Sequence, residues 1–233
     1  MNVTADRRAR SSWLLAFGDV ITLLITFFIM VIALNNAQVS KLQSWTDQQI
    51  TIAYQSFAEE IKNQGLQVIS VTQTPQGILF AVQSSAAFNS ADYYPSQQLL
   101  GELQYLGSLL RENRLFNLQN LPQEAKIIDY ALEQGMQWKA EIVIEGHTDN
   151  DPILPTSPLR NNWFLSAMRA QTVMGELFKV SQLPADLFSI SGYSEYHPVA
   201  DNGNEAGKEL NRRIEILLTA GFEKLQEVEA VAN

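Results

Sequence analysis

The sequence predicts an α+β protein with one N-terminal transmembrane helix, a helical connector, and a domain whose mixed sheet is covered by helices. One observation is an apolar run over residues 13–34. Another is the helical spacing of apolar residues over 37–64. The third is a succession of strand and helix patterns over 66–220, typical of a sheet with helices on one face. We expect an N-terminal tail at 1–12, a connector at 35–65 and a C-terminal tail at 221–233.

The apolar run has one charged member, Asp19. About 20 mostly apolar residues cross a bilayer as a helix, and a lone helix satisfies its own backbone hydrogen bonds. A cleaved signal peptide is the alternative, but its apolar core is shorter and ends at a small-x-small site. The following "LNNAQVS" fits such a site poorly. We therefore favour a retained membrane anchor.

Charge and cysteine content indicate where the two ends of the chain lie. Arg7, Arg8 and Arg10 precede the apolar run, and the next basic residue is Lys41. Positive residues stay on the cytoplasmic side, so we expect a single pass through a bacterial inner membrane with the C-terminal domain in the periplasm. The absence of cysteine suits that compartment. The net charge of −9 argues against nucleic acid as a partner.

Asp19 is the first candidate functional residue, because an ionisable group inside a membrane is costly and usually functional. Thr22 and Thr26 follow at i+3 and i+7, on one helical face with Ala16 and Ala33. A face of small and hydroxyl residues suits a helix–helix contact with access to water. Alternatively, both threonines only bond their own i−4 carbonyls. The pattern favours a functional Asp19 and leaves both interpretations of the threonines open; the candidate ion-translocating group is Asp19, Thr22 and Thr26.

The connector and the domain elements follow in order. The helix predicted over 37–64 ends at Gly65 and serves either as a spacer or as a second functional segment. A hairpin with a Pro-x-Gly turn at 75–77 comes next. An amphipathic helix over 95–113 follows, with an apolar stripe of leucines on one side: Leu99, Leu100, Leu103, Leu106 and Leu110. The stretch 111–140 is hard to place and holds one extra helix. A strand over 139–146, a helix over 161–180, a strand and turn over 187–200 and a strand over 211–220 complete the domain.

Four separated blocks carry a family resemblance: "GHTDN" (146–150), "NNWFLSAMRA" (161–170), "LFSISGYSEYHPVADN" (187–202) and "NRRIEI" (211–216). In order and spacing they resemble the OmpA-like peptidoglycan-binding domain. The resemblance implies that Asp149 and Arg169 hold the amine and carboxylate of diaminopimelate in the wall peptide, as suits a carboxylate and a bidentate guanidinium. The remaining matches either join the site or only hold its loops; they are Thr148, Asn162, Asn211 and Arg212. "DPILPTSPLR" (151–160) lengthens the loop of the simple domain.

The anchor "WLLAFGDVITLLITFFIM" (13–30), combined with this domain, resembles the MotB-type stator subunit of the bacterial flagellar motor. That resemblance implies that Asp19 carries H⁺ or Na⁺ through a channel shared with a polytopic MotA-type partner. It also implies a homodimer, attachment to peptidoglycan, and an amphipathic plug after the anchor. Gly18 stands where the family usually has Ala, and both are small enough for close helix packing.

The sequence argues against an enzyme. The two histidines, His147 and His197, lie in no metal-ligand spacing, and no G-x-S-x-G motif occurs. We expect no catalytic residues, metal or cofactor, and interpret His147 as a loop-fixing residue. Two other functions share this layout: a passive tether between membrane and wall, and a non-flagellar motor such as the B subunit of the Zorya anti-phage system. The sequence leaves open the ion, the kind of motor, and the identity and copy number of the partner.

Overall fold

The computed structural model describes residues 3–83, 87–89, 92–154 and 156–225, without the side chains of 3–12 and 34–39. The basic residues before the anchor therefore lie outside the described side chains, and residues 226–233 of the expected tail lie outside the described chain. The chain forms two compact units, Met1–Trp45 and Thr46–Asn233. Helix α1 (Val3–Gln64) contributes to both, and each unit is described by itself.

The first unit is helical throughout its described residues. Trp13–Ala33 is the one segment of the described chain that is long and apolar enough to cross a membrane. Its side chains are exposed, as a lipid-facing helix requires. The expected N-terminal apolar helix is confirmed.

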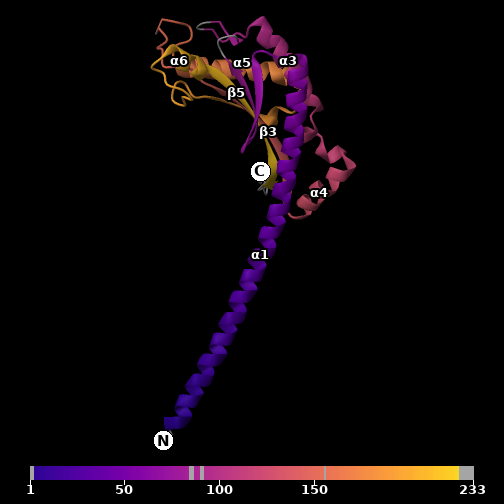
Figure 1. Cartoon of the computed structure of the whole chain (residues 1–233), viewed down its shortest axis with the longest axis vertical. Helices are drawn as coiled ribbons and strands as arrows, with labels where there is room; N and C mark the ends of the chain where they lie inside the picture. Colours follow the sequence, from indigo (N-terminus) through magenta and orange to yellow (C-terminus); the bar gives the residue numbers. More distant parts are fainter. Residues whose placement is uncertain (1–2, 84–86, 90–91, 155, 226–233) are drawn as a thin grey trace, which may run out of the picture. The chain divides into compact units, whose positions relative to one another are not determined.

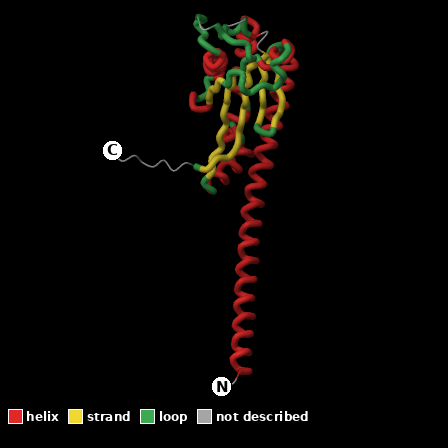
Figure 2. Tube along the Cα trace, turned by 90° about the vertical axis from the view of Figure 1, so that its left-hand side faces the viewer, coloured by secondary structure: helices red, strands yellow, loops and turns green. Residues whose placement is uncertain are grey.

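The second unit contains one five-stranded sheet, drawn in yellow in Figure 2. The order is β1 (Ile69–Thr74), β2 (Gly77–Gln83), β5 (Arg213–Lys224), β3 (Met136–Gly146) and β4 (Phe188–Gly192). β3 pairs with β4 in parallel, and the other neighbours are antiparallel. The last strand in the sequence is thus central in the sheet, and the expected mixed sheet is confirmed.

The predicted hairpin is present, with Thr74 opposite Gly77 across a two-residue turn. Pro75 pre-sets the backbone of this turn. Gly77 has φ +146°, and a Cβ there would lie 2.2 Å from the carbonyl oxygen of Leu218 on β5. Both conditions demand glycine at the point where the hairpin meets the central strand.

Helices α3 (Gln97–Glu112) and α5 (Asn162–Ser181) pack together, and α5 lies along β3 and β4 (Figure 1). Each has an N-cap: the side chains of Ser96 and Asn161 accept hydrogen bonds from Leu99 N and Phe164 N. The apolar stripe predicted for α3 is buried on this interface, apart from the half-buried Leu100. Part of the core therefore lies where α5 contacts α3 and the sheet.

The second half of α1, residues 46–64, belongs to the second unit. Ala53, Phe57 and Ile61 are buried there, and the Phe57 ring meets Phe80 of β2 edge-to-face at 5.0 Å. Gly65 ends the helix with φ +71°, and its N–H bonds the carbonyl of Ile61, a left-handed cap that favours glycine. This part of the predicted connector helix is thus built into the core.

The region 111–140 resolves into two 3₁₀ turns, η1 (Arg114–Phe116) and η2 (Leu118–Asn120), helix α4 (Pro122–Glu133) and the start of β3. The extra helix expected here is α4. Another helix, α6 (Glu205–Asn211), was not expected, because seven residues carry too little periodicity to indicate one. β5 consequently begins at Arg213 rather than 211, and it continues to Lys224 because β3 pairs with it over that length.

Candidate functional site

The loop after β3 is held between the ends of two neighbouring strands. His147 N donates to the carbonyl of Arg213 at 3.0 Å, and Thr148 N donates to that of Ser194 at 2.9 Å. A Cβ on Gly146 would lie 2.0 Å from the backbone oxygen of Ser166, so α5 passes closely and only glycine fits. These contacts fix the direction in which Thr148 and Asp149 leave the sheet.

Asp149 is a buried carboxylate with partners on both oxygens. Arg212 Nη1 donates to its Oδ2 at 2.6 Å, and Asp151 N donates to its Oδ1 at 3.1 Å. A second nitrogen of Arg212 reaches Glu205 Oε1 at 2.8 Å. Arg212 thus orients the Asp149 carboxylate, which agrees with the loop-holding alternative for this arginine.

Arg169 projects from α5 and is 4% exposed. Its Nε donates to the carbonyl of Asp92 at 2.8 Å, and its guanidinium lies 4.9 Å from the centre of the Phe88 ring. Burial lowers the pKa of Arg169 to about 10, while the carboxylate of Asp149 acts in the opposite direction. The side chain therefore stays charged at neutral pH in a largely desolvated place, where it interacts strongly with an anion.

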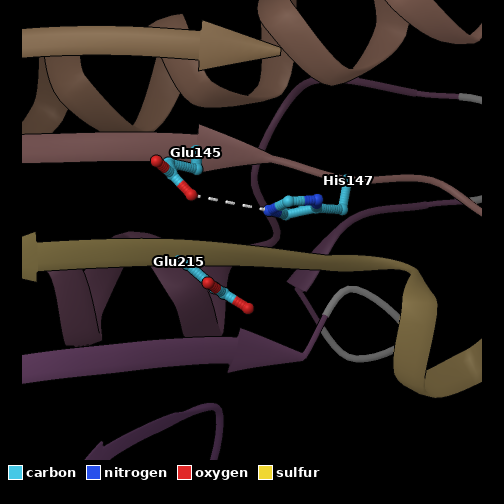
Figure 3. Close-up of side chains that lie close together, drawn as sticks. All are labelled: Glu145, His147 and Glu215. Carbon is cyan, nitrogen blue, oxygen red and sulfur yellow. Dashed lines mark ion pairs between the residues drawn. The ribbon is translucent and has the colours of Figure 1, made fainter. Parts of the chain in front are cut away.

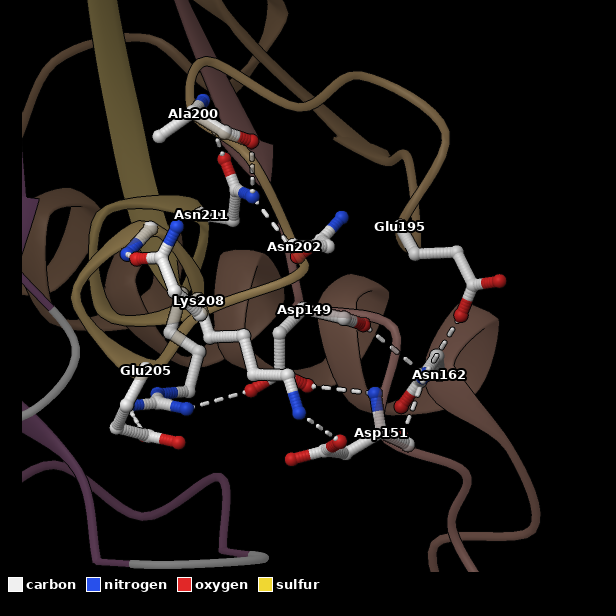
Figure 4. Close-up of polar contacts among 12 residues, drawn as sticks. Asp149, Asp151, Asn162, Glu195, Ala200, Asn202, Glu205, Lys208 and Asn211 are labelled. Atoms are coloured by element: carbon white, nitrogen blue, oxygen red, sulfur yellow. Dashed lines mark hydrogen bonds and ion pairs between the residues drawn. The ribbon is translucent and has the colours of Figure 1, made fainter.

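The two asparagines of the motif hold loops, as Figure 4 shows. Asn162 Nδ2 donates to the carbonyls of Asp149 and Asp151 and to Glu195 Oε2. Asn211 is fully buried, and its amide bonds the backbone of Ala200 through both its oxygen and its nitrogen. Asn162 therefore shapes the site loop directly, whereas Asn211 supports the neighbouring loop.

A cavity of about 620 Å³ brings the predicted residues together. Thr148, Asp149, Asn162, Arg169 and Arg212 line it, and Asn211 does not. Thr148 Oγ1 is buried and has no hydrogen-bond partner among the described residues. A buried hydroxyl in a cavity wall with unused hydrogen-bonding capacity is suited to contact a ligand.

The lengthened loop forms part of the cavity wall. Pro152, Ile153, Leu154 and Ser157 line the cavity from this loop, opposite polar groups of the motif. Lys208 of α6 fastens the start of the loop through Asp151 Oδ1 at 2.5 Å. The segment that departs from the simple domain thus adds an apolar wall to a charged cavity.

Sequence reasoning missed some cavity residues because no local pattern marks them. They lie in two other segments: Phe88 and Asn89 before α3, and Glu205 in α6. Asp151 also escaped notice, although its position two residues after Asp149 was a signal that could have been used.

The first unit carries the other predicted group on α1. Asp19, Thr22 and Thr26 are exposed there. Thr22 Oγ1 donates to the carbonyl of Gly18 at 2.7 Å, and Thr26 Oγ1 donates to those of Thr22 and Leu23 at 3.0 and 2.9 Å. These bonds are the ones expected if the threonines only satisfy backbone carbonyls of their own helix. Because the hydroxyl hydrogens point to the backbone, the oxygen lone pairs stay available as acceptors.

Comparisons with protein families match both units. A family model of the MotB plug region, described as membrane MotB of the proton-channel complex MotA/MotB, matches residues 4–48. A model of the OmpA family matches residues 117–212.

Similar full-length proteins include motility protein B of Bacillus subtilis, 28% identical, with 91% of this chain and 92% of the relative covered. Motility protein B of Helicobacter pylori strain J99 is 24% identical, over 100% of this chain and 95% of the relative. The uncharacterized protein YtxE of Bacillus subtilis is 24% identical, over 91% and 90%.

Two solved structures resemble the chain in fold. The cell wall anchor of the type VI secretion system from Pseudomonas aeruginosa has a TM-score of 0.51 and 26% identity, covering 70% of this chain and 93% of that one. A MotB-like protein from Desulfovibrio vulgaris has a TM-score of 0.58 and 18% identity, covering 76% and 94%. The long apolar helix and the charged cavity of an OmpA-like domain fit the class of membrane proteins with a periplasmic-type domain. Within that class, both parts of the chain resemble the MotB type of stator subunit.

Proposed function

We propose that the chain is the B-type subunit of an ion-driven membrane motor, fixed to peptidoglycan by its OmpA-like domain. One observation carries the wall-binding half: a carboxylate, Asp149, and a guanidinium, Arg169, line the same cavity. The zwitterionic end of diaminopimelate offers an ammonium to the first and a carboxylate to the second. The similar Pseudomonas structure is itself a cell wall anchor, which supports the same role.

The hydrogen bonds that Asp149 and Arg169 already make favour a small zwitterionic ligand over a plain cation. Arg212 bonds one oxygen of Asp149, so an entering ammonium shares a carboxylate that is already partly neutralised. Arg169 already donates to the backbone carbonyls of Asp92 and Asn89, and its burial reduces the competition of water for the guanidinium. A ligand with both charges satisfies both groups at once, while a ligand with one charge leaves the other group without its counterpart.

Cosedimentation of the full chain in detergent with purified peptidoglycan tests this half of the proposal. Asp149→Asn and Arg169→Gln should each lower the bound fraction by about tenfold or more, because each leaves one ligand charge unpaired. Asp186→Asn removes an equal charge from an exposed position outside the cavity and serves as the control. Free meso-diaminopimelate should compete, and Nα-acetyl-L-lysine, in which no carbon carries both an ammonium and a carboxylate, should compete poorly. Equal binding by all variants would refute the assignment.

The ion-carrying half rests on Asp19. The residue lies inside both the apolar span and the matched MotB region. A tether gains nothing from a carboxylate there, whereas an ion carrier needs one. Each elementary charge that crosses the membrane makes about 2.3 kcal/mol available per 100 mV. In this proposal Asp19 takes up H⁺ or Na⁺ from the periplasmic side and releases it to the cytoplasm, with Thr22 and Thr26 lining the pathway.

The partner in this proposal is a MotA-type polytopic membrane protein, and the chain acts as a homodimer. One exposed helix with a single carboxylate encloses no pathway, so the second surface must come from another chain. Cysteines placed singly over residues 18–26 of this cysteine-free chain should cross-link at periodic positions when the partner is present. A uniform absence of cross-links would count against the dimer.

The full-length relatives named motility protein B favour flagellar motility over a defence system of the same build. An anchor and stator role requires no catalysis, and we propose none for this chain.

A further inference from the structure

Three potential metal ligands gather at the end of two paired strands, outside the cavity. Glu145 lies on β3, His147 follows it, and Glu215 lies on β5 (Figure 3). One ligand atom from each lies within 4.8 Å of the others. Ile144 and Gly146 alternate with these residues and face α5, so the cluster lies on the opposite face of the sheet.

The two glutamates form a pair that is unfavourable by itself. Glu145 and Glu215 stand directly opposite each other in the ladder, where like charges destabilise a sheet. Arg213 Nε bonds Glu215 Oε1 at 2.5 Å and neutralises one charge. Burial, and then the neighbouring Glu215, raise the pKa of Glu145. Two carboxylates against one guanidinium leave an excess negative charge in this part of the described structure.

His147 adds a second, independent observation. The side chain is 2% exposed, and neither ring nitrogen has a hydrogen-bond partner among the described residues. Its Nε2 points at Glu145 Oε2 from 3.9 Å, as the dashed line in Figure 3 marks. Burial, followed by the charge of Arg213, lowers the pKa of His147 to about 4, so this contact is no ion pair at neutral pH. A buried imidazole whose two nitrogens lack hydrogen-bond partners among the described residues is suited to bind a water or an ion.

We propose that Glu145, His147 and Glu215 bind a divalent transition-metal ion of the Zn²⁺ type. A neutral imidazole and two carboxylates are a donor set that such ions prefer, and the ion supplies the missing positive charge. Metal–ligand bonds of about 2.0–2.2 Å require the outermost donors to approach by about an ångström, which glutamate side chains allow by rotation. Arg213 can keep its bond to the other oxygen of Glu215.

Such an ion bridges β3 and β5, because its ligands come from both strands. His147 directly precedes Thr148 and Asp149, so fixing its ring also fixes the start of the cavity loop. The sequence does not reveal this site, because Glu215 lies on a distant strand and only the β3–β5 register brings it opposite Glu145. The inference is independent of the proposed wall binding.

Metal binding is testable on the full chain in detergent, purified without a polyhistidine tag. Titration with Zn²⁺ should show one site per chain, and Zn²⁺ at about 100 times the dissociation constant should raise Tm by about 5–10 °C. The chain has two histidines and no cysteine. With Cu²⁺ as the probe, nitrogen hyperfine structure from imidazole in the electron paramagnetic resonance spectrum can therefore arise only from His147 or His197.

Glu145→Gln and His147→Gln should weaken Zn²⁺ binding by at least about tenfold, and His147→Gln should abolish the nitrogen signal. Glu141→Gln removes a carboxylate from the same face of β3, away from His147, and should bind Zn²⁺ like the wild type. Glu145→Gln keeps the size of its side chain, so it remains informative if the histidine variant fails to fold. Absence of stoichiometric Zn²⁺ binding, or equal binding by Glu145→Gln and wild type, would overturn the proposal.

Discussion

Replacing Phe57 tests whether the second half of α1 is an integral part of the periplasmic-type domain. The side chain is 1% exposed and packs edge-to-face on Phe80 at 5.0 Å. Phe57→Ala therefore loses a fully buried ring and leaves a cavity, which costs about 3–5 kcal/mol of unfolding free energy. For a domain of this size that corresponds to a fall in Tm of about 6–20 °C.

The assay is urea and thermal unfolding of the full chain in detergent, followed by circular dichroism. Gln55→Ala, at an exposed position on the same helix, is the matched control and should stay within about 0.5 kcal/mol of wild type. If Phe57→Ala unfolds like Gln55→Ala, residues 46–64 do not belong to the core. If the variant is destabilised as expected, residues 46–64 are part of the domain core and are not available to act as a plug.

Three further perturbations follow from the site. Arg212→Ala leaves the buried Asp149 carboxylate without its guanidinium and should cost about 1–3 kcal/mol in urea unfolding, whereas an unchanged midpoint would show that the pair is unimportant. Burial lowers the pKa of His147 from 6.5 to about 4 in the folded chain, so between these pH values the unfolded chain binds a proton that the folded chain does not. With a chelator present, the free energy of unfolding should therefore fall by about 3 kcal/mol as the pH is lowered from 6.5 to 4. His147→Gln should flatten that profile, and an unaltered slope would contradict the assignment. Gly146→Ala places a Cβ 2.0 Å from Ser166 O, so the variant should express poorly or unfold at least about 10 °C lower; a Tm like that of wild type would refute the close approach.

Local patterns predicted the elements that local physics determines. The Pro-x-Gly turn, the leucine stripe of α3 and the glycine after α1 each act within a few residues, and all three have their predicted roles. The i−4 bonds of Thr22 and Thr26 are equally local. Short elements such as α6 were not predicted, because packing and a side-chain cap define them rather than a periodic pattern.

The candidate site was predictable only where separated blocks matched a known pattern. These blocks indicated Asp149 and Arg169, which line one cavity. They gave no sign that the backbone carbonyls of Asn89 and Asp92 accept hydrogen bonds from Arg169, or that Glu145 and Glu215 stand opposite each other. Both facts depend on strand register and chain crossings, which one sequence does not display.

Ion passage at Asp19 can be measured as an ion flux across the membrane. Residues 38–45 are deleted in the complex with the MotA-type partner. The deletion removes the plug segment that the MotB resemblance implies and leaves intact residues 46–64, the part of α1 that belongs to the second unit. Cytoplasmic pH and Na⁺ are then followed in cells that carry this deletion alone, with Asp19→Asn, or with Asp47→Asn, which alters an exposed acid outside the apolar span. We expect the deletion to leak H⁺ or Na⁺, Asp47→Asn to leave the leak unchanged, and Asp19→Asn to abolish it. A leak of equal size with Asp19→Asn would refute ion passage at this residue.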